Sequence, residues 1–417
     1  MEVILMISKN ELNFSLLAET QLASPMFKQK AYDIYKELRA FQPVYPLSLC
    51  EQGQGWLITR YEDAMALLKD ARLMKNFENV FSKKEDVKVP FSLENRELLR
   101  NHMLNSDPPD HHRLRSLVQK AFTPQMILQL ECRIQHIADA LLNKVEHTHS
   151  INLVNDYAFP LPIMVISEML GIPLEDQHKF RIWSQAIIDT PLRLEDVQKN
   201  NQKLEEFTEY IQYLVYKKRK NPTDDLISAL IQAESEGIKL NASELYSTIT
   251  LLIVAGHETT VNLIANMTLA LLEHPVQLQK LLQNPDLIDS AIEEALRFYS
   301  PVELTTIRWT AEPFTMHGQD IQSKDRIIIS LASSNRDEKI FSNADVFDVT
   351  RKNNRHIAFG YGSHFCLGAS LARLESKIAI STLLRRMPNL QIQGEREQVK
   401  WKESYLMRSL EELPLQL

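Results

Sequence analysis

The stretch Phe359-Gly360-Tyr361-Gly362-Ser363-His364-Phe365-Cys366-Leu367-Gly368 decides how the rest of this sequence is interpreted. It holds three of the ten glycines and one of the three cysteines in a chain of 417 residues. An apolar, helix-like run from Leu371 to Met387 follows at once. We therefore expect Cys366 on a loop just before a helix, where backbone N–H groups and the helix dipole favour its thiolate form.

The neighbours of Cys366 indicate what such a thiolate would do. The glycines allow a tight turn and the close approach of a flat ligand, while Phe365 and Leu367 would keep water from the sulfur. A soft, shielded thiolate suits an iron centre. A lone cysteine among apolar residues is more often a small buried hydrophobe, and we interpret Cys50 and Cys132 in that way.

This stretch resembles the haem-binding loop of the cytochrome P450 family. The family pattern is Phe, two residues, Gly, one residue, His or Arg, one residue, Cys, one residue, Gly; it is met at every position by Phe359, Gly362, His364, Cys366 and Gly368. The resemblance implies a mainly α fold with smaller β-sheet regions and a long central helix over haem b. It also implies that Cys366 is the axial iron ligand and that Phe359, Gly360, His364 and Gly368 border the cofactor.

Composition excludes several other classes of protein. Hydrophobic residues make up 44% and charged residues 24%, as in an ordinary globular protein. The net charge of -7 argues against general nucleic-acid binding. Three cysteines far apart cannot form a disulfide framework, so a reducing cytosol fits.

The N-terminus shows no sign of a membrane anchor. Its apolar run, residues 3–7, is far shorter than the roughly 20 residues of a membrane span, and it lacks a basic leader. We expect a cytoplasmic protein of the bacterial type. The resemblance implies one domain over residues 1–417, with residues 1–20 as an N-terminal extension.

Periodicity and turn residues predict the order of elements. We expect a helix over residues 27–41, a β-hairpin over 44–61 and a short helix over 62–69. Residues 73–100 are polar and are expected to form an irregular loop, either solvated or closing over a substrate. Residues 124–240 are expected to be mostly helical.

The string Asp107-Pro108-Pro109-Asp110-His111-His112-Arg113-Leu114-Arg115 predicts the start of a helix. His111 and Arg115 are four residues apart on one helix face and could hold a carboxylate. The family has the same string, which implies that both side chains hold haem propionates. The resemblance assigns the same role to Arg308, at the end of an extended segment, and to His364.

A long apolar segment over residues 241–274 predicts the central helix. Within it, Glu258 and Thr259 are out of place, because burial of polar groups is costly unless they are satisfied. The threonine could simply bond back to a carbonyl one turn earlier. The family pattern here, Ala or Gly, Gly, any residue, Asp or Glu, Thr, Thr or Ser, implies more: Thr259 would hydrogen-bond dioxygen at the haem, and Glu258 would help to deliver protons.

Two further sets of residues complete the predicted site. Glu294, Arg297 and Arg351 are expected to form a buried structural trio, as in the family. The substrate pocket is expected to be walled by the central helix, the segment after Pro301 and a terminal hairpin over residues 405–414. Its predicted wall residues are Leu251, Ala255, Leu304, Thr305, Leu406 and Met407, of which Ala255 would also contact the haem.

The resemblance predicts a haem-thiolate monooxygenase that hydroxylates an apolar small molecule with O₂. Two electrons would come from a separate ferredoxin or flavodoxin with its reductase, docking near Arg113, Lys352 and Lys377. The alternatives are a haem sensor or carrier, which would need no Glu258–Thr259 pair, and a peroxygenase, whose family members typically replace that pair with Arg and Pro. The sequence leaves open whether the substrate is a fatty acyl chain, a terpenoid or a polyketide macrolide.

Overall fold

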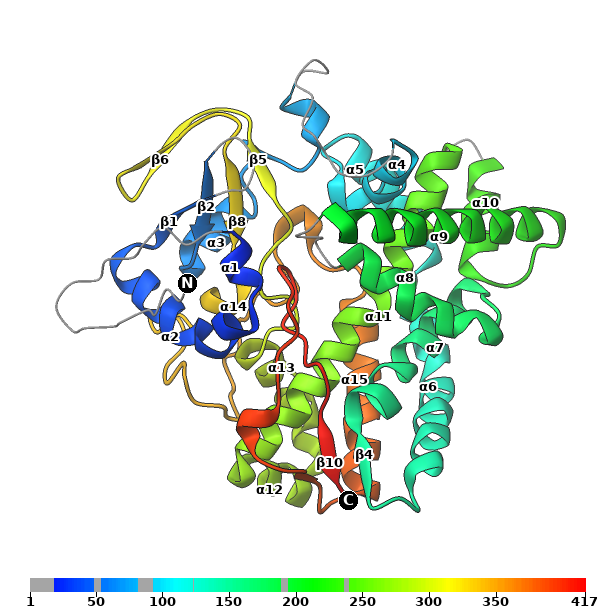
Figure 1. Cartoon of the computed structure of the whole chain (residues 1–417), viewed down its shortest axis with the longest axis vertical. Coiled ribbons are helices and arrows are strands. Elements are labelled where there is room, and N and C mark those ends of the chain that lie inside the picture. Colours follow the sequence, from blue (N-terminus) through cyan, green and yellow to red (C-terminus); the bar gives the residue numbers. More distant parts are fainter. Residues whose placement is uncertain (1–18, 49–53, 82–92, 123, 189–193, 236–239) are drawn as a thin grey trace.

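The computed structural model describes residues 19–48, 54–81, 93–122, 124–188, 194–235 and 240–417. Fifteen α-helices are present in these residues: α1 Glu19–Ala23, α2 Pro25–Phe41, α3 Tyr61–Leu67, α4 Leu93–Arg100, α5 Asp110–Ala121, α6 Pro124–Val145, α7 Pro160–Leu170, α8 Gln177–Ile188, α9 Leu194–Lys220, α10 Leu226–Ser235, α11 Ala242–Glu273, α12 Pro275–Gln283, α13 Ile288–Phe298, α14 Leu331–Ser334 and α15 Ala369–Arg386. The predicted mainly α fold is confirmed (Figure 1).

Helix α11 runs through the middle of the helical part (Figure 1). Its start is fixed by a capping box, in which the Asn241 side chain accepts from the N–H of Glu244 while the Glu244 side chain accepts from the N–H of Asn241. It packs against α4, α7 and α15. Its apolar length could cross a membrane, but 72% of its most apolar window is buried inside the fold, as in the core helix of a globular protein.

Ten short strands form three sheets among the described residues: β1 Val44–Leu47, β2 Gly55–Ile58, β3 Leu73–Met74, β4 Ser150–Asn152, β5 Arg308–Thr310, β6 Phe314–Met316, β7 Gln319–Ile321, β8 Arg326–Ile329, β9 Gln391–Ile392 and β10 Pro414–Gln416. The largest sheet has the order β1-β2-β8-β5-β3. Most helices lie to one side of β1, β2, β5 and β8, whereas α1, α2, α3 and α14 lie beside these strands (Figure 1). Antiparallel pairing of β1 with β2 confirms the predicted hairpin, whose turn, together with Cys50, lies outside the described residues.

The prediction that residues 73–100 form an irregular loop is wrong for the last eight of them. Residues 93–100 form helix α4, in which Leu98 is buried and Leu99 lines the central cavity. Ser247 of α11 donates to the carbonyl of Leu98 at 2.7 Å, which ties the two helices together. Residues 82–92 lie outside the described part of the chain.

The predicted terminal hairpin is present only in outline. Trp401 and Leu410 form an isolated antiparallel bridge, and the N–H of Lys402 donates to the carbonyl of Ser409. A second bridge joins Met407 to Val302, so the tip of this segment lies along the extended chain that follows Pro301. Two predicted pocket walls therefore touch each other.

A buried group of charges fixes these two walls in place. The carboxylate of Glu303 accepts from Lys28 of α2 at 3.0 Å, from the Tyr35 hydroxyl at 2.8 Å and from Arg408 at 3.4 Å. Lys28 and Glu303 are fully buried. Since removal of one partner would leave an uncompensated buried charge, this group holds Leu304 close to the terminal segment.

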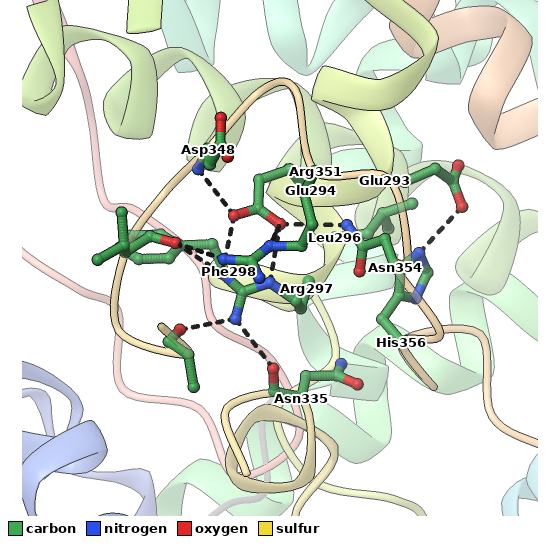
Figure 2. A network of polar contacts seen from close by, with 12 residues as sticks. Glu293, Glu294, Leu296, Arg297, Phe298, Asn335, Asp348, Arg351, Asn354 and His356 are labelled. Atoms are coloured by element: carbon green, nitrogen blue, oxygen red, sulfur yellow. Dashed lines mark hydrogen bonds and ion pairs between the residues drawn. The ribbon is translucent and has the colours of Figure 1, made fainter. Parts of the chain in front are cut away.

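The predicted trio around Glu294 is confirmed as a buried network (Figure 2). Arg297 donates to both carboxylate oxygens of Glu294 at 2.8 Å, and Arg351 donates to one of them at 2.9 Å. The N–H of Asp348 and the amide of Asn354 add two more bonds. The loop that leads towards Cys366 is thereby attached to α13.

Glu294→Ala should lower the free energy of unfolding by about 3–5 kcal/mol, because Arg297 would keep a buried charge without a partner. Urea unfolding of the purified protein measures this change. Asp289→Ala, on the same helix, removes the exposed partner of Lys377 and should change stability by less than about 1 kcal/mol. Equal losses in the two variants would contradict the structural role of Glu294.

Candidate active site

One cavity of about 510 Å³ lies between α11 and the loop that carries Cys366. Its lining is mostly apolar, and it brings together nearly all of the residues that the sequence predicts for the site. The predicted residues that line it are His111, Arg115, Leu251, Ala255, Thr259, Leu304, Thr305, Arg308, Phe359, Gly360, His364, Cys366, Gly368, Leu406 and Met407. The exception is Glu258.

The Cys366 loop has the tight geometry that its glycines predict. Gly362 has a φ of 77°, and a Cβ there would lie 3.1 Å from the carbonyl oxygen of Leu68, so a larger residue would clash with α3 and strain the backbone. The N–H of Cys366 donates to the carbonyl of Phe359 at 2.9 Å, which closes the loop. Helix α15 then begins at Ala369, as expected.

The prediction that this position alone favours the Cys366 thiolate is incomplete. Burial raises the pKa of the Cys366 thiol above its usual value, and the hydrogen bond from the N–H of Gly368 and the charges of Arg115 and Arg373 only oppose this effect. A bound cation such as iron would favour the thiolate at this position. The guanidinium carbon of Arg373 lies 4.5 Å from the centre of the Phe359 ring, at the start of the loop that carries Cys366.

Basic side chains gather along the cavity next to the loop. The rings of His111 and His364 are 4.2 Å apart, and both nitrogens of His111 are buried without a hydrogen-bond partner. Arg115 donates to the carbonyl of Phe365 at 2.8 Å. Burial lowers the pKa of Arg308 to about 10, and the nearby carboxylate of Asp107 only partly opposes this effect.

Sequence reasoning missed Lys75 and His102, which line the same cavity. Lys75 is buried, and its ammonium group donates to the carbonyl of Ile307 at 3.1 Å. Burial lowers the pKa of His102 to about 4, so its imidazole is neutral. Neither residue belongs to a motif, because each lies in a polar stretch whose fold the sequence does not indicate.

Helix α11 presents a hydroxyl to the cavity, as predicted. Thr259 lines the cavity, and its hydroxyl donates to the carbonyl of Ala255 at 2.9 Å, which is the back-bond that the sequence suggested. Gly256 lets α7 pack closely, since a Cβ there would lie 3.0 Å from the Ile166 side chain. Thr250 also lines the cavity, and its hydroxyl is buried without a hydrogen-bond partner.

Glu258 is on the same helix but does not reach the cavity lining. It is 8% exposed, and the nearest charged or ionisable group is the imidazole of His257, with Nε2 3.8 Å from Oε2. A proton relay through Glu258 therefore requires its side chain to turn, or water to connect it to the cavity.

The residues present fit a haem group. Gly368 lines the cavity, and a Cβ built on it meets no atom within 4 Å, which leaves room for a flat ring beside Cys366. The unpartnered nitrogens of His111 and the cations of Arg115, Arg308 and Lys75 suit the two carboxylates of such a ring. The described residues contain no cluster of three or more His, Cys, Asp or Glu side chains for a metal ion, so an iron centre here depends on the ring and one cysteine.

Comparison with known proteins agrees with this geometry. The family model of the cytochromes P450 matches residues 50–412. A cytochrome P450 of Bacillus subtilis (strain 168) is 68% identical over 410 residues, covering 98% of this chain and 100% of that protein. The polyketide biosynthesis cytochrome P450 PksS of the same organism is 43% identical over 394 residues, covering 94% of this chain and 96% of its own.

A solved structure shares the fold. The crystal structure of the myxobacterial cytochrome P450 CYP267B1, in complex with myristic acid, superimposes with a TM-score of 0.90 at 41% identity and covers 95% of this chain and 98% of that one. The chain therefore belongs to the cytochrome P450 family. It is a haem-dependent monooxygenase that acts on a small molecule and takes electrons from redox partners, and its relatives named here are described as cytochromes P450 rather than as sensors or carriers.

The cations predicted for docking of a redox partner differ in their exposure and in the ion pairs that they already form. Arg113 is bound to Asp110 and Glu244 and is about one-third exposed. Lys377 forms an exposed pair with Asp289. Lys352 is exposed in the loop before Cys366, as is Arg355. Exposed ion pairs are weak, so Lys377 stays available to a partner, whereas Arg113 is already engaged.

The neutral state of His102 predicts a loss of stability in acid. The unfolded imidazole titrates near 6.5 and the folded one near 4, so the unfolded state binds the proton first as the pH falls. His102 should then contribute about 2 kcal/mol less to folding at pH 5 than at pH 7. Urea unfolding at pH 7 and pH 5 measures this effect. Between these two values, the free energy of unfolding should fall less in His102→Gln than in the native protein.

His147 provides the control for this experiment, since it is exposed. His147→Gln should lose as much stability between pH 7 and pH 5 as the native protein. An unchanged loss in His102→Gln would show that the folded protein does not hold this imidazole neutral.

Proposed function

We propose that Cys366 is the axial ligand of haem b and that the basic side chains beside it hold the haem propionates. The observation that carries this proposal is one cavity that contains the Cys366 thiol, the partnerless imidazole of His111 and the guanidinium of Arg308. Carboxylates of the cofactor would provide hydrogen-bond partners for His111 and His364 and an opposite charge for Arg115, Arg308 and Lys75.

The bound haem supplies the iron at which dioxygen is activated. The chain's own part is to hold and move protons and to control water. The Thr259 hydroxyl donates a hydrogen bond to the carbonyl of Ala255, so the lone pairs of its oxygen are free to accept a hydrogen bond within the cavity. Thr259 thereby orders a water molecule or a reacting oxygen, and Glu258 supplies the protons as a general acid.

The substrate is proposed to be an extended acyl or polyketide chain. The lining of the cavity is mostly apolar, with Leu251, Leu304, Leu406 and Met407 among its members. Burial of a long hydrocarbon there is favourable by about 0.8 kcal/mol for each CH₂ group. A myristic acid complex of one relative and the name of another, which places it in polyketide biosynthesis, support this class of substrate.

The remaining proposals concern where and with whom the enzyme works. Electrons are proposed to come from a ferredoxin or flavodoxin with its reductase, which would dock by its acidic surface near Lys352 and Lys377. The enzyme is proposed to be cytoplasmic. The whole chain, residues 1–417, is proposed to form one domain, with residues 1–20 as an N-terminal extension.

Cys366→Ser should abolish the absorption band of the reduced carbon monoxide complex near the blue-violet edge, because an alcohol oxygen is a poorer ligand than a thiolate. Absorption spectra of the reduced protein with and without carbon monoxide measure this. Cys132→Ser should keep the band, because Cys132 is exposed and not buried as the sequence suggested. Its persistence in Cys366→Ser would refute the ligand assignment.

Thr259→Ala should retain haem and reduce product formation per NADPH, with the electrons released as hydrogen peroxide. The loss of an ordered hydroxyl leaves proton delivery uncontrolled, and a several-fold rise in peroxide per NADPH is expected. Thr268→Ala is the matched control, since Thr268 makes the same back-bond, to Ile264 at 2.9 Å, on the same helix. Full coupling in Thr259→Ala would exclude Thr259 from this role.

The substrate class is tested by the ferric spin shift that accompanies displacement of water from haem iron. Saturated fatty acids of increasing length should bind more tightly with each added CH₂ group, up to the length at which the cavity is full. Terpenoids serve as the comparison set. Spin shifts with terpenoids alone would overturn the proposed class of acyl or polyketide chains.

A further inference from the structure

The position of Glu258 raises the question of what holds its side chain away from the cavity. Its side chain is 10% exposed, and among the described residues its one recorded charge partner is His257. No Lys or Arg of the described residues pairs with it, in contrast to Glu294 or Glu303. The immediate neighbour in sequence is thus the ionisable group that lies nearest to this acid among those paired with it.

The protonation of His257 follows from its contacts. The residue is fully buried, and its Nδ1 lies 2.7 Å from the carbonyl oxygen of Ile253. Because a carbonyl oxygen only accepts, Nδ1 carries the hydrogen. Burial lowers the pKa of His257, and the ring of Phe159 packs edge-on against it at 5.8 Å, so the imidazole is neutral.

The other ring nitrogen, Nε2, carries no hydrogen and can therefore only accept a hydrogen bond. Nε2 of His257 is buried without a hydrogen-bond partner among the described residues, which is unfavourable for folding. It lies 3.8 Å from Oε2 of Glu258, slightly beyond hydrogen-bond distance. A protonated Glu258 could donate to Nε2 after a small rotation or through one water molecule, whereas an ionised Glu258 has no proton to donate.

We propose that His257 is a positioning residue for Glu258, with Nε2 accepting a hydrogen bond from the protonated carboxyl and holding the loaded acid outside the cavity. This inference rests on the proposed role of Glu258 as proton donor. When the side chain turns, Glu258 gives its proton towards the cavity and becomes a carboxylate. It then takes a proton from solvent water and returns to Nε2, while His257 keeps its Nδ1 hydrogen throughout.

Infrared spectroscopy of the haem-loaded enzyme tests the contact directly. The C=O stretch of the protonated Glu258 carboxyl is assigned by its loss in Glu258→Gln. In His257→Leu this band should shift to higher frequency or vanish, because its hydrogen-bond acceptor is gone. In His257→Gln, whose amide oxygen can accept the same bond, the band should stay near its native position.

His274 provides a matched control at the other end of α11. Its Nδ1 lies 2.7 Å from the carbonyl oxygen of Ala270, the same bond that His257 makes to Ile253. His274→Leu should therefore leave the Glu258 band unchanged, even where it lowers stability. A band that is absent in the native enzyme, or identical in His257→Leu, would overturn the proposal.

Turnover gives a second readout, with myristic acid as the added compound and a surrogate redox chain. His257→Leu should raise hydrogen peroxide per NADPH several-fold, and His257→Gln should restore a near-native value. Unchanged peroxide in Glu258→Gln would instead remove Glu258 from proton delivery, whatever the infrared band shows. The two failures are thus distinguishable.

Discussion

The carboxylate of Glu294 is the constraint on which the arrangement of the site depends. It receives hydrogen bonds from Arg297, Arg351, Asn354 and the backbone of Asp348, in a place from which water is excluded. These bonds attach α13 to the long irregular segment that precedes Cys366. A segment without regular structure is otherwise free to move, and the proposed iron ligand Cys366 lies at its end.

A second buried carboxylate plays the same part on the substrate side. Glu303 joins Lys28 near the start of the chain to Arg408 near its end, and the wall residues Leu304 and Met407 are the sequence neighbours of Glu303 and Arg408. Both carboxylates are fully satisfied, which makes them specific tethers rather than large sources of stability. The cavity is thus lined by α11 and by two segments that buried charges hold in place. One is the loop that carries Cys366, and the other is the wall that contains Leu304 and Met407.

Within α11, three polar residues in succession have different surroundings. His257 and Glu258 lie off the cavity lining, whereas Thr259 belongs to it. In the proposed relay, the proton would therefore be held by a residue off the cavity lining and used beside a residue that belongs to it.

The sequence by itself determined the class of protein, because a loop that must turn tightly around a cysteine leaves a dense local pattern from Phe359 to Gly368. It also determined α5, α11 and α15, since the signals for them, the prolines before α5, the capping box of α11 and the apolar run of α15, are local. Tertiary structure alone decided the rest. Lys75 and His102 reach the cavity through the folding of a polar stretch, α4 forms where its leucines meet α11, and Glu258 turns from the cavity although its motif predicts a role there. Each of these outcomes depends on contacts between residues far apart in the chain, or on which face of a helix meets which neighbour, and neither leaves a periodic signal in the sequence.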